Sequence, residues 1–210
     1  MNVEPEWLAW AREIAAIAQS GLAFSPNQYD RERYERLRTL SAIMIASRAA
    51  ERFERIEALF GCEAGYATPK VDVRGAVFDG EMRILLVRER ADADRWSLPG
   101  GWADVNLTAA ENVIKEVEEE SGLRVRAVKL AVVFDRTRQG HTPGIFSCYK
   151  LFFLCEVIGG AAAPGCETSA VGWFAEDRIP DDLSLGRVLP GQIRRLFQHA
   201  RDAALPTDFE

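Results

Sequence analysis

The sequence predicts an α+β protein: an α/β/α sandwich with a mixed sheet, preceded by a small all-helical N-terminal domain. Three observations support this fold class. Apolar residues recur at helical spacing through about the first 60 residues. From Val71 onward, runs rich in valine, phenylalanine, tyrosine and leucine indicate strands. Helical patterns interrupt these strands without regular βαβ alternation, which favours helices on both faces of a mixed sheet.

The N-terminal region is predicted to form three helices. Residues 5–20 have an amphipathic pattern, for which Pro5 suits the first turn and Gly21 suits the end. A second helical pattern covers residues 28–60. Its length favours two helices with a break near Ser47.

Two glycines and a proline between residues 61 and 69 indicate a domain boundary. We therefore assign residues 1–66 to the helical domain and residues 67–210 to the larger domain. A helical unit of this size buries little apolar surface alone. We expect it to form a homodimer; the alternative is that it covers its own larger domain.

In the larger domain, the pattern predicts strands at residues 71–78, 83–88, 125–135, 145–157 and 173–174, and a closing helix at 190–204. Asp79-Gly80, between the first two strands, favours a hairpin turn. A glycine-rich turn and a further helix follow the second strand. Thr108 and Glu111 have capping-box spacing at the start of that helix, and Gly122 is suited to end it.

This helix carries several closely spaced glutamates. At about 100° per residue, Glu116, Glu119 and Glu120 share one stripe, whereas Glu118 points away. Such crowding is unfavourable without a cation, and Mg²⁺ held by a few carboxylates usually acts on phosphates. The alternative is a solvated acidic surface helix. The preceding tight turn, Leu98 to Gly101, and the adjacent apolar stripe favour the metal site.

The composition excludes several classes of function. A net charge of −6 and a pI of about 5.2 argue against stable nucleic-acid binding. No segment has the length and apolar character of a membrane span. The four cysteines have no CxxC spacing, which is typical of reduced thiols in a cytoplasmic protein.

The segment from Gly101 to Leu123 resembles the signature of the Nudix hydrolases: Gly, five residues, Glu, seven residues, then Arg-Glu-apolar-x-Glu-Glu-x-Gly-apolar. Two positions depart from it. Leu107 replaces the first Glu, and Lys115 replaces the Arg. In the family these two residues form an ion pair that steadies the loop, and they are not metal ligands.

A wider resemblance covers nearly the whole chain. Residues 68–75, 101–105 and 149–156 are similar to a Nudix branch that has an extra helical N-terminal domain. That branch hydrolyses nucleoside diphosphates linked to another group, such as ADP-ribose or CDP-choline. The resemblance implies a Nudix α/β/α sandwich as the catalytic domain.

We predict Glu116 and Glu120 as the main Mg²⁺ ligands, with Mn²⁺ as the alternative ion. Glu119 is predicted to be a shared ligand or to activate water, and the Gly100 carbonyl to be the backbone ligand, as the resemblance also implies. In similar enzymes a glutamate from a later loop reaches the metals, and Glu167 has that place here. Its alternative is an ordinary loop acid.

Phosphate contacts are predicted for four cations: Arg74, Arg88, Arg136 and Lys150. Arg74 is favoured because it lies within an otherwise apolar strand. Each has the alternative of an ordinary surface cation. Trp102, just after the turn, is predicted to stack on a base or, alternatively, to pack in the core.

The predicted function is a Mg²⁺-dependent pyrophosphohydrolase. It would cleave a nucleoside diphosphate derivative into a nucleoside monophosphate and a phosphorylated product. Within the same class, the substrate is alternatively a nucleoside triphosphate or an RNA 5′ end. From a different class, the alternative is a catalytically silent nucleotide-sensing module.

Overall fold

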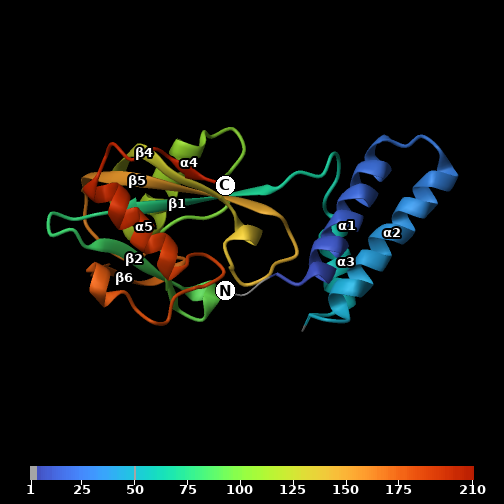
Figure 1. Ribbon diagram of the computed structural model, residues 1–210, viewed down its shortest axis with the longest axis horizontal. Helices are drawn as coiled ribbons and strands as arrows, with labels where there is room; N and C mark the ends of the chain where they lie inside the picture. The colour runs from blue at the N-terminus through green and yellow to red at the C-terminus, as the bar shows by residue number, and fades with distance from the viewer. Residues whose placement is uncertain (1–3, 50) are drawn as a thin grey trace. The chain divides into compact units, whose positions relative to one another are not determined.

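The computed structural model describes residues 4–49 and 51–210 (Figure 1). The chain forms two compact units: Met1–Lys70 with Pro143–Ser147, and Val71–Thr142 with Cys148–Glu210. The boundary predicted at residue 66 remains a prediction. No helix in the described residues is both long enough and apolar enough to cross a membrane.

The first unit contains α1 (Glu6–Phe24), α2 (Gln28–Ala46) and α3 (Phe53–Gly61). The predicted break near Ser47 is confirmed, because α2 ends there. The predicted end of the first helix at Gly21 is wrong. At Gly21 a Cβ atom would lie 2.4 Å from the ring of Tyr34, so the glycine makes room for α2 while α1 continues. The helices enclose a core of apolar side chains: Leu8, Ala11, Ala42, Ile45, Ile56 and Phe60.

The second unit contains two longer helices, α4 (Ala109–Ser121) and α5 (Pro190–Arg201). Its strands are β1 (Lys70–Val77), β2 (Ile84–Glu89), β3 (Arg95–Ser97), β4 (Leu123–Asp135), β5 (Cys148–Gly160), β6 (Thr168–Phe174) and β7 (Asp208–Phe209). They form a four-stranded sheet in the order β1-β5-β4-β7 and a three-stranded sheet in the order β3-β2-β6. The larger sheet is mixed, because β4 pairs antiparallel with β5 and parallel with β7.

The α+β class is confirmed, but the strands form two sheets where the sequence predicts one. The predicted hairpin at Asp79-Gly80 is reduced to one bridge between Phe78 and Ile84. Beyond that bridge β1 joins β5, whereas β2 pairs with β3 and β6, so the two strands diverge. The sequence also missed β3 and β7, which are too short to show a period.

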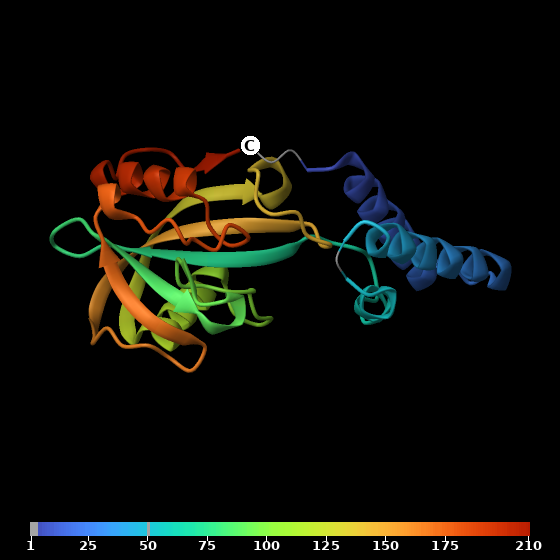
Figure 2. The ribbon, with the colours of Figure 1, turned by 90° about the horizontal axis from the view of Figure 1, so that it is seen from below.

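Helices cover both faces of the sheets (Figure 2). On one face α5 contributes Ile193, Leu196 and Phe197 to a core cluster. On the other face α4 contributes Val113 and Val117 to a second cluster. Side chains alternate along a strand, so neighbouring residues serve opposite cores. The sandwich is therefore confirmed.

Because of the same alternation, charged side chains of β1 and β5 lie together near one end of the strands. Ala76 of β1 faces the α5 cluster, and Arg74 and Asp72 continue that face of the strand. Phe152 of β5 faces the same cluster, and Lys150 precedes it by two residues. All of these side chains are buried. A single face of the strands thus passes from apolar core to charged side chains.

Candidate active site

The glycine turn between β3 and α4 lies against β1. The Gly75 N–H donates to the Pro99 carbonyl at 2.8 Å, and the Val73 N–H donates to the Gly101 carbonyl at 2.9 Å. Gly100 has φ of +144°, and a Cβ atom there would lie 2.0 Å from the Val73 carbonyl oxygen. Only glycine fits at this point.

The start and end predicted for the acidic helix are confirmed. Both halves of the capping box form between Thr108 and Glu111, and Gly122 ends α4 in the left-handed conformation with φ of +70°. Val113 and Val117 are fully buried, which fixes the face that α4 turns toward the sheet. The orientation of the glutamates follows from this packing.

A cavity of about 620 Å³ opens between the turn, α4 and the strands. Its lining includes the predicted site residues Arg74, Gly100, Trp102, Glu116, Glu120, Arg136 and Glu167. Both signs of charge are present, because Glu89 and Arg187, among others, also line it. Such a cavity can bind a ligand that carries both anionic groups and metal ions.

Among the acids of α4 that line this cavity, Glu120 is the most buried. Its Oε2 atom accepts a hydrogen bond of 2.9 Å from the Gly100 N–H. Burial, followed by the nearby charge of Glu89, raises the pKa of Glu120 to about 8. Burial also raises the pKa of Glu116. The two carboxylates therefore occupy a position where an added cation is favourable.

Glu119 lies apart from this cavity. Its side chain is 57% exposed and forms an ion pair of 3.1 Å with Lys115. It lines a separate surface depression together with Glu118. The role predicted for Glu119 remains a prediction that this geometry does not favour.

Glu167 comes from the loop before β6 and lines the same cavity as Glu116 and Glu120. Its backbone carbonyl accepts a hydrogen bond of 3.0 Å from the Arg90 N–H. The structure therefore brings together acids from α4 and from a loop about 50 residues later in the chain.

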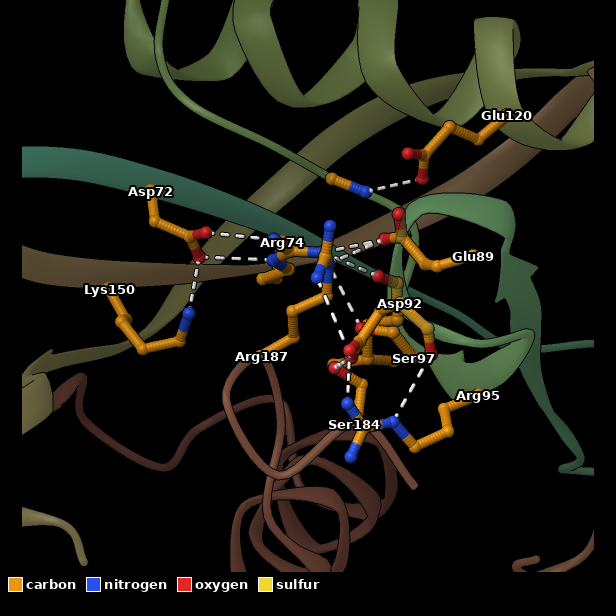
Figure 3. A network of polar contacts seen from close by, with 12 residues as sticks. Asp72, Arg74, Glu89, Asp92, Arg95, Ser97, Glu120, Lys150, Ser184 and Arg187 are labelled. Carbon is orange, nitrogen blue, oxygen red and sulfur yellow. Dashed lines mark hydrogen bonds and ion pairs between the residues drawn. The ribbon is translucent and has the colours of Figure 1, made fainter. Parts of the chain in front are cut away.

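A chain of charged side chains, all buried except the half-buried Arg187, forms one wall of the cavity (Figure 3). Lys150 Nζ lies 2.7 Å from Asp72, and Asp72 binds Arg74 through two hydrogen bonds of 3.0 and 2.8 Å. Arg74 Nη1 lies 3.5 Å from Glu89 Oε1, which also lies 3.0 Å from Arg187 Nε. The chain thus alternates in sign from Lys150 to Arg187.

Burial sets the titration of these groups. It lowers the pKa of Lys150 to about 8, an effect that the attraction of Asp72 partly offsets. Burial alone would raise the pKa of Asp72, but the charges of Arg74 and Lys150 outweigh it and lower that pKa. Asp72 is therefore the anion that holds two cations in place.

The predicted cations differ in their surroundings. Arg74 lines the cavity, but its donors are engaged with Asp72, Ser97 and the Leu98 carbonyl. Arg136 also lines the cavity, and its Nη2 donates to the Thr142 carbonyl at 2.6 Å.

The two remaining candidates lie nearer to solvent. Arg88 does not line the cavity; it pairs with Asp182 at 2.8 Å and lies over the ring of Trp96. Trp102 lines the cavity and is 56% exposed, so it is not a core residue. The geometry therefore favours Trp102 and Arg136 over Arg88 as ligand-binding residues.

Five charged residues that line the cavity were missed from the sequence: Asp72, Glu89, Asp92, Arg95 and Arg187. Asp72 and Glu89 carried a signal, because each is the single acid in a strand whose other residues are mostly apolar. Arg187 lies in the irregular segment before α5, where no periodicity marks it.

The donor set fits a hard divalent cation. Glu116, Glu120 and Glu167 offer carboxylate oxygens to one cavity, and these are the ligands that Mg²⁺ and Mn²⁺ prefer. Among the described residues, no group of three or more acidic, histidine or cysteine side chains is already placed to hold a metal ion.

The loop after the turn is held by a device that differs from the signature. Lys115 Nζ pairs with Asp104 at 3.2 Å, so Asp104 replaces the acid missing at Leu107. Asn112 is buried and accepts a hydrogen bond of 2.8 Å from the Asp104 N–H. Its amide also donates to the Asp104 and Thr108 carbonyls at 3.2 and 3.1 Å.

Comparison with known proteins identifies the family. Residues 68–192, more than half of the chain, match the family model described as the NUDIX domain. The chain belongs to the Nudix family. Residues 5–60 match a second model, described as a UDP-X-like, N-terminal oligomerisation domain. The predicted resemblance to Nudix proteins with a helical N-terminal domain is therefore confirmed.

Two relatives of this Nudix protein match its whole length, and a third matches about two thirds of it. A provisionally named ADP-ribose pyrophosphatase, YjhB, of Bacillus subtilis (strain 168) is 46% identical over 210 residues, 100% of both chains. A solved UDP-X diphosphatase is 30% identical, covers 100% of both chains and has a TM-score of 0.62. An ADP-ribose pyrophosphatase from Streptococcus suis 89-1591 is 37% identical, with a TM-score of 0.60 over 68% of this chain and 100% of its own. The Nudix protein is accordingly a hydrolase that acts on phosphorus anhydride bonds.

Proposed function

We propose that this Nudix hydrolase cleaves the diphosphate bridge of a nucleoside diphosphate derivative in a Mg²⁺-dependent reaction. The products are a nucleoside monophosphate and a phosphorylated remainder. One observation carries the proposal: carboxylates from α4 and from the Glu167 loop share a cavity with Lys150 and Arg136. A diphosphate bridge is the kind of group that needs both cations and metal-binding acids.

Glu116 and Glu120 are the proposed metal ligands, with the Gly100 carbonyl as the backbone ligand. When bound, Mg²⁺ supplies charge neutralisation at the phosphate oxygens and polarises the bond to be broken. Glu167 is the proposed proton acceptor for the attacking water, because it is exposed and lines the cavity from the loop before β6. Glu119 is the alternative acceptor.

Lys150 and Arg136 are the proposed phosphate-binding cations. Lys150 is held at the cavity wall by Asp72, the one hydrogen-bond partner of its ammonium group among the described residues, so its remaining donors are available for phosphate oxygens. Arg74 acts differently: it fixes Asp72 and Glu89. Trp102 is the proposed stacking surface for the base, since it is exposed at the cavity.

ADP-ribose is the proposed substrate, with CDP-choline as the second compound to test. The names of the B. subtilis and S. suis relatives support ADP-ribose. The deciding experiment is a panel of nucleoside diphosphate conjugates and nucleoside triphosphates assayed with Mg²⁺ and with Mn²⁺. We expect two phosphorylated products from a conjugate; release of inorganic pyrophosphate from triphosphates alone would refute the proposal.

We also propose that the helical unit forms a homodimer. The description of the matching N-terminal domain supports this. Trp10, Ile17 and Phe24 of α1 are more than half exposed, and their seven-residue spacing places them on one stripe. Light scattering should give twice 23.4 kDa for the native chain. Ile17→Glu should give the monomer, whereas Ala23→Glu, which adds the same charge elsewhere on α1, should remain a dimer.

A further inference from the structure

The loop that carries Glu167 is fastened to the C-terminal end of α4. The Ala163 N–H donates to the Ser121 carbonyl at 2.9 Å. At Gly165 the approach is closer still, because a Cβ atom there would lie 1.8 Å from the Glu119 carbonyl oxygen. The backbone of the loop therefore lies directly against the last turn of the acidic helix.

Thr168 joins these two segments. It is fully buried, and its hydroxyl donates to the Glu120 carbonyl at 2.8 Å. The hydroxyl oxygen of Thr168 in turn accepts a hydrogen bond of 2.8 Å from the Gly165 N–H. The last carbonyls of a helix lack partners within the helix, and the Thr168 hydroxyl provides a partner for one of them. The same hydroxyl also binds the backbone of the loop.

Glu167 is the residue next to this joint. Thr168 fixes the backbone on the C-terminal side of Glu167. The carbonyl of Glu167 accepts a hydrogen bond of 3.0 Å from the Arg90 N–H. Its carboxylate remains exposed and lines the cavity with Glu120. An exposed side chain on a fastened backbone has a defined range of positions.

We infer that Thr168 is a positioning residue, whose hydroxyl holds the loop acid Glu167 in place against the helix acid Glu120. The inference rests on the proposed function, because that function gives Glu167 its role as proton acceptor. The hydroxyl is the part that matters, since valine has nearly the same shape but can make neither hydrogen bond.

The test uses Thr168→Val and Thr168→Ser in the full-length chain. Valine should lower kcat for ADP-ribose about 10- to 100-fold with little change in KM, and serine should restore most of it. Hydrogen exchange should show lost protection of the Gly165 amide in the valine variant alone. The matched control is Thr207→Val, which removes a hydroxyl bound to the Leu130 carbonyl at 2.7 Å. It should leave kcat unchanged.

A double-mutant cycle separates positioning from a general loss of structure. If Thr168 acts through Glu167, Thr168→Val should cause no further loss of kcat in a Glu167→Gln background. Independent, multiplicative losses would overturn the inference, as would a Thr168→Val enzyme that matches wild type.

Should Thr168→Val fail to fold, Gly165→Ala displaces the loop with Thr168 intact, and the same non-additivity is expected. A wild-type enzyme inactive on every conjugate would refute the proposed function instead. Protection of the Gly165 amide, expected to be lost in Thr168→Val and kept in Thr168→Ser, then decides whether the hydroxyl holds the loop.

Discussion

The carboxylate of Glu120 accepts a 2.9 Å hydrogen bond from the backbone N–H of Gly100. These residues are 20 positions apart in the sequence and belong to the acidic helix and the glycine turn. At the cavity, the contact links the acidic helix of the Nudix signature to the glycine turn that precedes it. It depends on the backbone of Gly100, which no other residue type can adopt at this site without a clash.

Replacement of Gly100 by alanine should therefore damage both stability and activity. The added Cβ would meet the Val73 carbonyl at 2.0 Å, and we expect a loss of about 3 kcal/mol or more in the free energy of unfolding. Urea denaturation measures it. The control is Gly191→Ala in α5, where a Cβ meets no atom within 4 Å. That variant should change stability by less than about 1 kcal/mol.

The acids of α4 should differ in their importance for turnover. We expect Glu116→Gln and Glu120→Gln to lower kcat by about two orders of magnitude or more, because both side chains line the cavity. Glu119→Gln should retain most of the activity, since Glu119 pairs with Lys115 at the surface. Equal losses in Glu119→Gln and Glu120→Gln would show that Glu119 reaches the reacting groups.

The titration of Glu120 should make stability depend on pH. Burial and the charge of Glu89 raise the pKa of Glu120 to about 8 from an ordinary value of 4.5. The folded chain then binds this proton more tightly than the unfolded chain does. Its contribution to stability is present below pH 4.5 and is lost as the pH rises to about 8.

This dependence is measured by subtracting the unfolding free energy of Glu120→Gln from that of wild type, without divalent ions, between pH 4.5 and 8. The stability of wild type relative to Glu120→Gln should fall as the pH rises. Added Mg²⁺ should reduce this fall, because it binds the ionised carboxylate of the folded chain. Subtraction removes the titrations of other groups, such as Lys150. A difference that is constant with pH would contradict the expectation.

The loop after the glycine turn should depend more on Asn112 than on its ion pair. Asn112→Ala removes a buried amide that accepts from the Asp104 N–H and donates to the Asp104 and Thr108 carbonyls, and we expect a loss of about 2 kcal/mol in stability. Asp104→Asn removes only the exposed pair with Lys115 and should cost less than about 1 kcal/mol. Chemical denaturation of the two variants compares them directly.

The local features of the site could be predicted from the sequence. The capping box at Thr108 and the left-handed end at Gly122 depend on neighbouring residues only, and both are confirmed. The orientation of Glu119 could not be predicted in the same way. Helical geometry puts it within roughly 60° of Glu116, and only the packing of Val113 and Val117 against the sheet decides which side faces the cavity.

Long-range pairing explains the other differences. Arg74 was predicted to bind phosphate, yet it is engaged by Asp72, which lies two residues earlier on the same face of β1. That signal was present in the sequence. The contact of Lys150 with Asp72, by contrast, joins residues 78 positions apart and requires β5 to lie beside β1.

The arrangement of the cavity wall depends on correct strand pairing. One face of the sheet carries Asp72, Arg74 and Ala76 on β1 and Lys150 and Phe152 on β5. A shift of either strand by one residue would turn its charges toward the α4 core and its apolar side chains into the cavity. Misregistered chains would thus be both unstable and inert. Enzymatic turnover can serve as a quality check on refolded material, because no slipped conformer would contribute to the signal.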